Sequence, residues 1–134
     1  MIEHFHPIKV YYRDVDKMGI VYYSRYFEYF EESRTELLTS IGLQITNVEQ
    51  DGGKLPVISS HCDFKKPAEF GDAILVRSWI NKSPRSTLKI LYMAFLKKTN
   101  SLLATGYTIH AFVNSRGKPI KAPKIILDCI QKNL

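Results

Sequence analysis

One change of periodicity constrains the fold of this chain more than any other feature. From Ser24 to Ile41 the bulky apolar residues recur every three or four positions, which is the spacing of one face of an α-helix. Ser24 is a suitable N-cap and Gly42 a suitable C-terminal stop. The sequence therefore predicts one amphipathic helix of about four to five turns. The residues on its expected buried face are Tyr26, Phe27, Tyr29, Phe30, Ser33, Leu37 and Ile41.

The rest of the chain is rich in β-forming residues. A first strand is expected at 8–12, and further strands follow the helix at 56–65, 72–81, 87–97 and 102–114. The breaks between these later strands are short, which favours antiparallel hairpins because parallel strands need long crossovers. A polar connection with the turn signal Asp51-Gly52-Gly53 precedes the second strand. Pro123 is expected to open a short helix that runs to Leu134.

This order of elements predicts an α+β domain in which a five-stranded antiparallel sheet is covered on one face by one long helix. The 134 residues, 45% of them hydrophobic, are enough for a single domain spanning 1–134. The helix carries more bulky aromatic residues than one small sheet needs for its cover. We therefore expect a second subunit to extend the sheet and hide its edge.

Charge and composition narrow the choice of partner. The net charge of +6 favours a phosphate-bearing small molecule, a nucleic acid or an anionic membrane. The aromatic residues cluster in the predicted helix, where packing explains them better than base stacking, so no nucleic-acid binding is expected. No apolar run is long enough to cross a bilayer, and the first residues lack the pattern of a secretion signal. Cys62 and Cys129 stand apart, as in a cytoplasmic protein with reduced thiols.

The candidate chemistry lies in the loop before the helix. Asp14 and Asp16 precede a helix N-terminus, whose unpaired N–H groups can stabilise an oxygen that gains negative charge. An aspartate beside such a site can attack a carbonyl carbon or deprotonate a water that does so. Gly19 would let the backbone approach a ligand closely. Aspartates are also common in turns before helices without any catalytic role, so the spacing proposes acyl transfer without establishing it.

The same region resembles a known family. The stretches YRDVDKMGIVY (12–22) and YFEYFEESR (26–34) are similar to the signature of the 4-hydroxybenzoyl-CoA thioesterase-like family of the YbgC type. Weaker matches are DFKKPA (63–68), Gly71-Asp72, GKP (117–119) and Ala122-Pro123, so the resemblance extends over essentially the whole chain. It implies a hot-dog fold, with sheets paired in a dimer and a dimer of dimers (a homotetramer) expected. It also implies hydrolysis of acyl-coenzyme A, with no metal and no cofactor.

The resemblance assigns roles by position. The second aspartate of the D-x-D-x-x-G pattern, here Asp16, is implied to be the catalytic carboxylate, as nucleophile or as general base. The backbone N–H near Tyr23 is implied to polarise the thioester carbonyl, and Asp14 to brace the loop. Tyr12, Gly19 and Tyr22 are expected to line the substrate site. Members of the YbgC type often carry His where this chain has Tyr23, which leaves the acyl preference open.

Other polar residues are candidates for binding. Ser59 and Ser60 could hydrogen-bond the ligand, although they are equally suited to be ordinary strand residues. In the family, the regions around Arg85, Lys118 and Lys121 lie near the coenzyme A nucleotide, and a solvated basic face is the alternative interpretation. His4 and His6 are interpreted as part of a flexible terminus rather than metal ligands. An acyl-carrier-protein substrate and a non-catalytic acyl- or CoA-binding module remain alternative functions.

Overall fold

The computed structural model describes residues 1–44 and 53–134 of the chain, so the predicted turn at 51–53 lies almost wholly outside the described residues. Its long helix is α1 (Arg25–Ser40), and a second helix, α3 (Lys124–Asn133), follows near the end of the chain. The strands are β1 (Ile2–Lys9), β2 (Val57–Phe64), β3 (Ala73–Ile80), β4 (Thr87–Leu96), β5 (Ser101–Val113) and the short β6 (Pro119–Ile120). A 3₁₀ turn covers Tyr12–Asp14.

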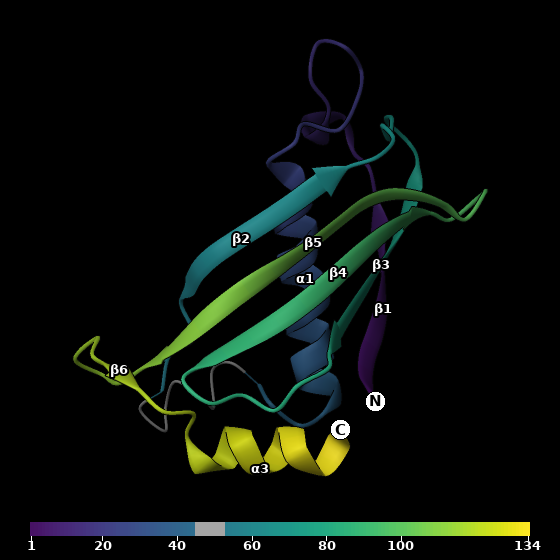
Figure 1. Ribbon diagram of the computed structural model, residues 1–134. Coiled ribbons are helices and arrows are strands. Elements are labelled where there is room, and N and C mark those ends of the chain that lie inside the picture. The colour runs from purple at the N-terminus through teal and green to yellow at the C-terminus, as the bar shows by residue number, and fades with distance from the viewer. Residues whose placement is uncertain (45–52) are drawn as a thin grey trace.

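The strands form one antiparallel sheet in the order β1-β3-β4-β5-β2, with β6 added beside β5 (Figure 1). The predicted hairpins between β3 and β4 and between β4 and β5 are confirmed. The expected hairpin between 56–65 and 72–81 is wrong, because β2 pairs with β5 at the edge of the sheet. A short break in the sequence limits how far the chain can travel, but it does not determine which strand becomes the neighbour.

The first strand differs from its prediction. It begins at Ile2 and ends at Lys9, so the predicted strand at 8–12 started too late and ended too far along the chain. His4 and His6 are not part of a flexible terminus, since they lie in β1 opposite Ser78 and Val76 of β3. Pro7 is compatible with this strand because β1 is an edge strand, where a missing N–H leaves no ladder bond unmade.

Helix α1 crosses one face of the sheet, as predicted (Figure 1). At the centre of the contact, the Phe30 ring stacks on the Tyr92 ring of β4 with centroids 4.3 Å apart. This approach depends on Gly106 of β5, because a Cβ atom at that position would lie 2.8 Å from Phe30 Cε2 and would also collide with the His61 carbonyl. The buried Ser33 hydroxyl hydrogen-bonds that of Ser78 at 2.9 Å, which fixes the helix on β3.

A short buried chain of hydrogen bonds runs through the same core. The Tyr92 hydroxyl lies 2.7 Å from Thr108 Oγ1, which in turn lies 2.8 Å from Nε2 of His110. Nδ1 of His110 lies 3.1 Å from the Leu55 carbonyl oxygen. Burial lowers the pKa of His110 below its ordinary value. In the described part of the chain, no helix is both long enough and apolar enough to span a membrane.

Candidate active site

Asp16 lies half-buried in the loop between the 3₁₀ turn and α1. One carboxylate oxygen, Oδ1, accepts the N–H groups of Met18 at 2.8 Å and of Ile20 at 3.4 Å. The backbone closes the same turn, with the Asp16 N–H donating to the Ile20 carbonyl and the Gly19 N–H to the Asp16 carbonyl, both at 2.9 Å. Among the described residues nothing donates a hydrogen bond to Oδ2. The turn therefore holds the carboxylate by one oxygen and leaves the other available.

Gly19 makes this tight turn possible. Its φ of +80° lies in the left-handed region that glycine adopts without steric cost. A Cβ atom at this position would meet no other atom within 4 Å, so the constraint is on the backbone angle and not on space. Gly19 therefore lies in the turn that fixes the orientation of the Asp16 carboxylate.

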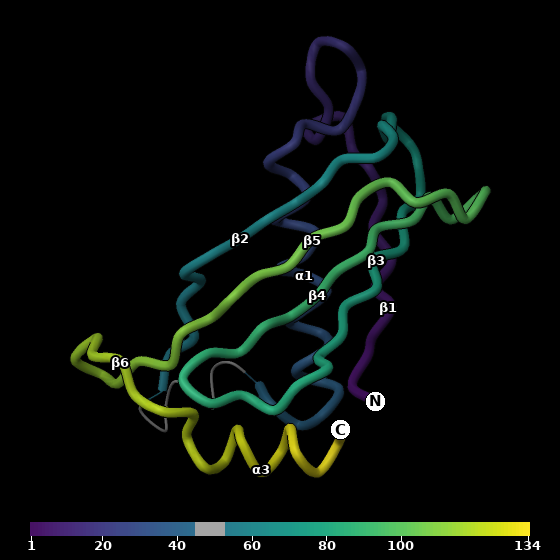
Figure 2. The backbone as a smooth tube through the Cα atoms, in the orientation of Figure 1, coloured from purple at the N-terminus to yellow at the C-terminus, as the bar shows by residue number. Residues whose placement is uncertain are grey.

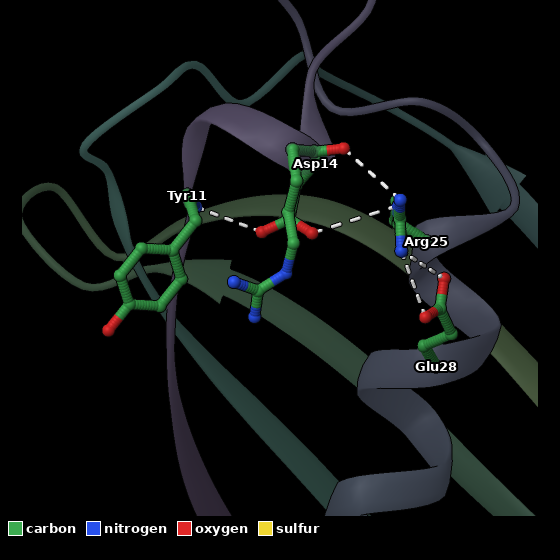
Figure 3. Close-up of polar contacts among 5 residues, drawn as sticks. Tyr11, Asp14, Arg25 and Glu28 are labelled. Carbon is green, nitrogen blue, oxygen red and sulfur yellow. Dashed lines mark hydrogen bonds and ion pairs between the residues drawn. The ribbon is translucent and has the colours of Figure 1, made fainter.

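Asp14 has a different environment from Asp16. It is buried, with 5% exposure, and its Oδ2 accepts the Tyr11 N–H at 2.9 Å (Figure 3). Its carbonyl oxygen accepts the Tyr22 N–H at 2.9 Å, and its Oδ1 lies 3.7 Å from Nε of Arg25. These contacts are the ones that a residue bracing the loop would make.

The start of α1 leaves backbone donors open. The N–H groups of Arg25, Tyr26 and Phe27 bond back to carbonyls of the turn that begins at Tyr22. Within residues 1–44 and 53–134, the Tyr23 N–H donates no hydrogen bond, and the Ser24 side chain makes no cap bond. Because such groups are unsatisfied and carry the positive end of the helix dipole, they can bind a negatively charged oxygen.

Aromatic side chains surround the loop. The rings of Tyr22 and Tyr23 lie together with centroids 4.6 Å apart and are 46% and 59% exposed. The neighbouring Tyr23 hydroxyl raises the pKa of Tyr22. The exposed Tyr12 ring lies 5.7 Å from Phe70, a residue that the sequence did not single out. Tyr26 is buried in the core against Phe64, as expected, and burial raises its pKa to about 12.

Ser59 and Ser60 lie on edge strand β2, opposite Ile109 and Thr108 of β5. Within the part of the chain that the structure describes, neither serine hydrogen-bonds to the Asp16 loop. The protomer therefore does not by itself join these two serines to the loop.

The basic residues that were predicted to bind coenzyme A lie together at the end of the sheet opposite Asp16. Arg85 lies in the turn between β3 and β4, and its carbonyl accepts the Ala122 N–H at 2.7 Å, which brings the segment at Lys121 beside it. Lys118 lies in the turn between β5 and β6. The loop before α1 joins the opposite end of β3, about 23 Å away at the usual rise per strand residue (Figure 2).

A cavity of about 390 Å³ opens at this basic end. It is lined by Arg85 and by two lysines, Lys82 and Lys89, that the sequence-based site did not include. Arg85 is one of the residues expected near the coenzyme A nucleotide, whereas Lys82 and Lys89 carry no local signal other than their charge. A second cavity, of about 720 Å³, lies between β1 and α1 and borders Asp14 and Tyr29 but not Asp16.

The remaining reactive side chains form no further centre. Burial raises the pKa of the Cys62 thiol to about 12, and both cysteines are free. No group of three or more His, Cys, Asp or Glu side chains that could hold a metal ion occurs in 1–44 and 53–134.

Comparison with known proteins identifies the family. The Thioesterase-like superfamily matches residues 10–130. The acyl-CoA thioesterase YbgC of Haemophilus influenzae is 30% identical over 120 residues, covering 88% of this chain and 87% of that protein. An acyl-acyl carrier protein thioesterase of Arabidopsis thaliana is 23% identical over 124 residues, covering 91% of this chain and 65% of that protein.

A solved structure agrees with these sequence relatives. The DHNA-CoA thioesterase of Staphylococcus aureus superposes with a TM-score of 0.91 at 26% identity, covering 99% of this chain and 91% of that one. The chain belongs to the Thioesterase-like superfamily and has the hot-dog fold. The predicted resemblance to thioesterases of the 4-hydroxybenzoyl-CoA and YbgC type is thereby confirmed, and the protein is a thioester hydrolase.

Proposed function

We propose that the protein hydrolyses acyl-coenzyme A to a carboxylate and free coenzyme A, with Asp16 as the catalytic carboxylate. The observation that carries this proposal is the pairing of a carboxylate that keeps one oxygen free with the open backbone N–H at Tyr23. The thioester carbonyl oxygen binds at the helix start, where the dipole and the N–H stabilise its developing charge. Tyr12, Gly19 and Tyr22 line the place of the acyl group.

Two routes satisfy this arrangement. In one, Asp16 attacks the carbonyl carbon, the thiolate of coenzyme A leaves and takes a proton, and water then cleaves the mixed anhydride. In the other, Asp16 removes a proton from a water that attacks the same carbon directly. Both need the free carboxylate oxygen and the oxyanion donor, so the role of Asp16 as nucleophile or base stays open.

We also propose that the site is completed by a second subunit. Strand β2 is an edge with exposed apolar residues, Val57, Ile58 and Phe64. If two β2 strands pair antiparallel about a two-fold axis, the Val57 end of one lies beside the Phe64 end of the other. The Val57 end adjoins the β5–β6 turn, since Lys54 pairs with Val113.

That pairing brings the Asp16 loop of one subunit close to the basic residues of the other, which lie at opposite ends of the sheet in a single protomer. The basic group of the second subunit (Arg85, Lys118 and Lys121, with Lys82 and Lys89) would approach the Asp16 loop of the first. Its positive charges suit the phosphates of the coenzyme A nucleotide, with Arg able to bind them bidentately. Ser59 and Ser60, on the paired strand, would lie between the two halves and could hydrogen-bond the substrate.

The decisive experiment is thiol release from a panel of acyl-CoAs, short to long and aliphatic to aromatic, by wild type and Asp16→Asn. Asparagine preserves the shape but can neither attack efficiently nor accept a proton, so kcat should fall by at least about 100-fold. Asp128→Asn, on the exposed face of α3, is the matched control and should leave kcat unchanged. Turnover near wild type in Asp16→Asn would exclude this mechanism.

The carrier of the acyl group has a second candidate. The basic end of the sheet would also suit the acidic surface of acyl carrier protein, and one relative bears the name of an acyl-acyl carrier protein thioesterase. Measuring the turnover of the same acyl chain on coenzyme A and on acyl carrier protein shows which carrier the enzyme prefers. Binding of acyl-CoA without turnover of any panel member on either carrier would instead support the non-catalytic acyl- or CoA-binding module.

A further inference from the structure

Arg25, the first residue of α1, joins the helix to the loop that precedes it. Its Nη1 lies 3.0 Å from both carboxylate oxygens of Glu28, one turn further along the helix. Its Nη2 donates to the Arg13 carbonyl at 3.1 Å, and its Nε lies 3.7 Å from Asp14 Oδ1 (Figure 3). One guanidinium group therefore contacts acceptors on both sides of the segment 15–24.

The segment between these contacts holds every reacting group of the proposed site. Its two ends are tied by the Tyr22 N–H bond to the Asp14 carbonyl, and Val15 and Val21 form an antiparallel bridge inside it. Asp16 is hydrogen-bonded to Ile20 next to this bridge, and Tyr23 follows at the helical end of the segment. The position of Asp16 relative to the Tyr23 N–H is thus set by how the loop base is fixed to α1.

Among the described residues, the loop base and the helix start are joined by two ion pairs, with Asp14 and with Glu28, and Arg25 takes part in both. Asp14 is buried, and the Arg25 guanidinium is the cation beside it. Removing Arg25 would leave the buried Asp14 carboxylate without its neighbouring cation. The loop base would then be held against the helix by backbone hydrogen bonds without the guanidinium, and its position would be less tightly fixed.

We propose that Arg25 is a positioning residue for thioester hydrolysis, which acts through Asp14 and the Arg13 carbonyl to hold Asp16 in register with the helix N-terminus. The inference rests on the proposed function of Asp16. Because a displacement of about 1 Å between reacting groups can cost on the order of 100-fold in rate, the effect falls on kcat. Arg25 itself makes no bond to substrate, so KM changes little.

The planar fork of arginine suits this task. Its three nitrogens reach Arg13, Asp14 and Glu28 in different directions, whereas a lysine ammonium supplies the charge as a single point. Arg25→Lys should therefore recover part of the rate that Arg25→Gln loses. The Arg25 side chain is about one-third exposed, so its loss costs less stability than breaking a fully buried pair would, and both variants should fold.

The test measures kcat and KM on the acyl-CoA that the wild type hydrolyses fastest, for Arg25→Gln, Arg25→Lys and the control Arg77→Gln. Arg77 also pairs with a glutamate, Glu3 at 2.6 Å, but on β3 and β1, away from the loop. We expect kcat to fall about 10- to 100-fold in Arg25→Gln and less in Arg25→Lys, with KM within about twofold. Arg77→Gln should match the wild type, and melting curves of all variants confirm folding at the assay temperature.

A double mutant separates positioning from a general loss of structure. If Arg25 acts through Asp14, Arg25→Gln should reduce kcat less in an Asp14→Asn background than in the wild type. Multiplicative losses, a raised KM with unchanged kcat, or wild-type kcat in Arg25→Gln would each overturn the proposal. Absence of turnover in the wild type itself would instead count against the proposed function.

Discussion

At the scale of single residues, Asp14 and Asp16 are two positions apart but lie in different environments. Asp14 is buried, accepts a backbone N–H and faces a guanidinium, so its oxygens are occupied by the protein. Asp16 keeps one oxygen without a hydrogen bond from the described residues. The carboxylate that braces the loop and the one proposed for catalysis are thus distinguished by their partners, and not by their residue type.

Arg85 offers a test of coenzyme A binding at the same scale. Neutralising it in Arg85→Gln should raise KM for acyl-CoA about tenfold, which corresponds to about 1.4 kcal/mol, because one charged contact with a phosphate is lost. The value of kcat should stay close to wild type, since Arg85 is proposed to bind the nucleotide phosphates and not the reacting thioester. Steady-state kinetics beside Lys98→Gln, an equal loss of charge in the β4–β5 turn, provide the check. An unchanged KM would remove Arg85 from the site.

At the scale of elements, the sequence predicted the long helix and the later strands because each has a local signal. The period of Tyr26, Phe30, Ser33 and Leu37 belongs to one helix face, and all four are buried there. The errors concern pairing, because β1 pairs with β3, which is distant in the sequence, and β2 joins β5 instead of β3. Pairing between strands that are distant in the sequence cannot be predicted from the local pattern of residues.

The contact between α1 and β5 yields a stability prediction. Gly106→Ala adds a Cβ atom that collides with the His61 backbone carbonyl and lies 2.8 Å from the Phe30 ring, which is held against Tyr92. Because the backbone cannot yield without shifting the strand, the free energy of unfolding should fall by about 1–3 kcal/mol or more. Chemical denaturation measures this change. An alanine at the exposed Ser115 is the control, and equal stability of the two variants would contradict the packing argument.

The buried hydrogen-bond chain predicts a dependence of stability on pH. Burial lowers the pKa of His110 in the folded protein, so between that value and the ordinary pKa of about 6.5 the unfolded chain binds more protons. Stability is therefore full above about pH 6.5 and is lost as the pH falls towards the folded pKa. Melting temperatures at pH 7.5, 6.5 and 5.5 should fall less in His110→Gln than in wild type.

At the scale of the whole molecule, the sequence named both halves of the candidate site but could not place them. The D-x-D-x-x-G pattern marks the Asp16 loop through its residue types, whereas Arg85, Lys118 and Lys121 are marked only by charge. The fold separates these groups by the length of β3, since β1 joins one end and the β3–β4 turn the other. If a second subunit completes the site, as proposed, the arrangement of its two halves cannot be predicted from the sequence of one chain.

The proposed assembly through β2 can be tested at its edge. Ile58 is 59% exposed on this edge strand, and a charge there would have to be buried when two β2 strands pair. Ile58→Glu should shift the protein from dimer or larger towards monomer in light scattering, and thiol release should fall in parallel, because the basic half of each site comes from the second subunit. Ile125→Glu changes a similarly exposed residue on α3 and should alter neither measurement. A monomeric Ile58→Glu variant with full activity would show that one protomer suffices, and the basic group would then need another role.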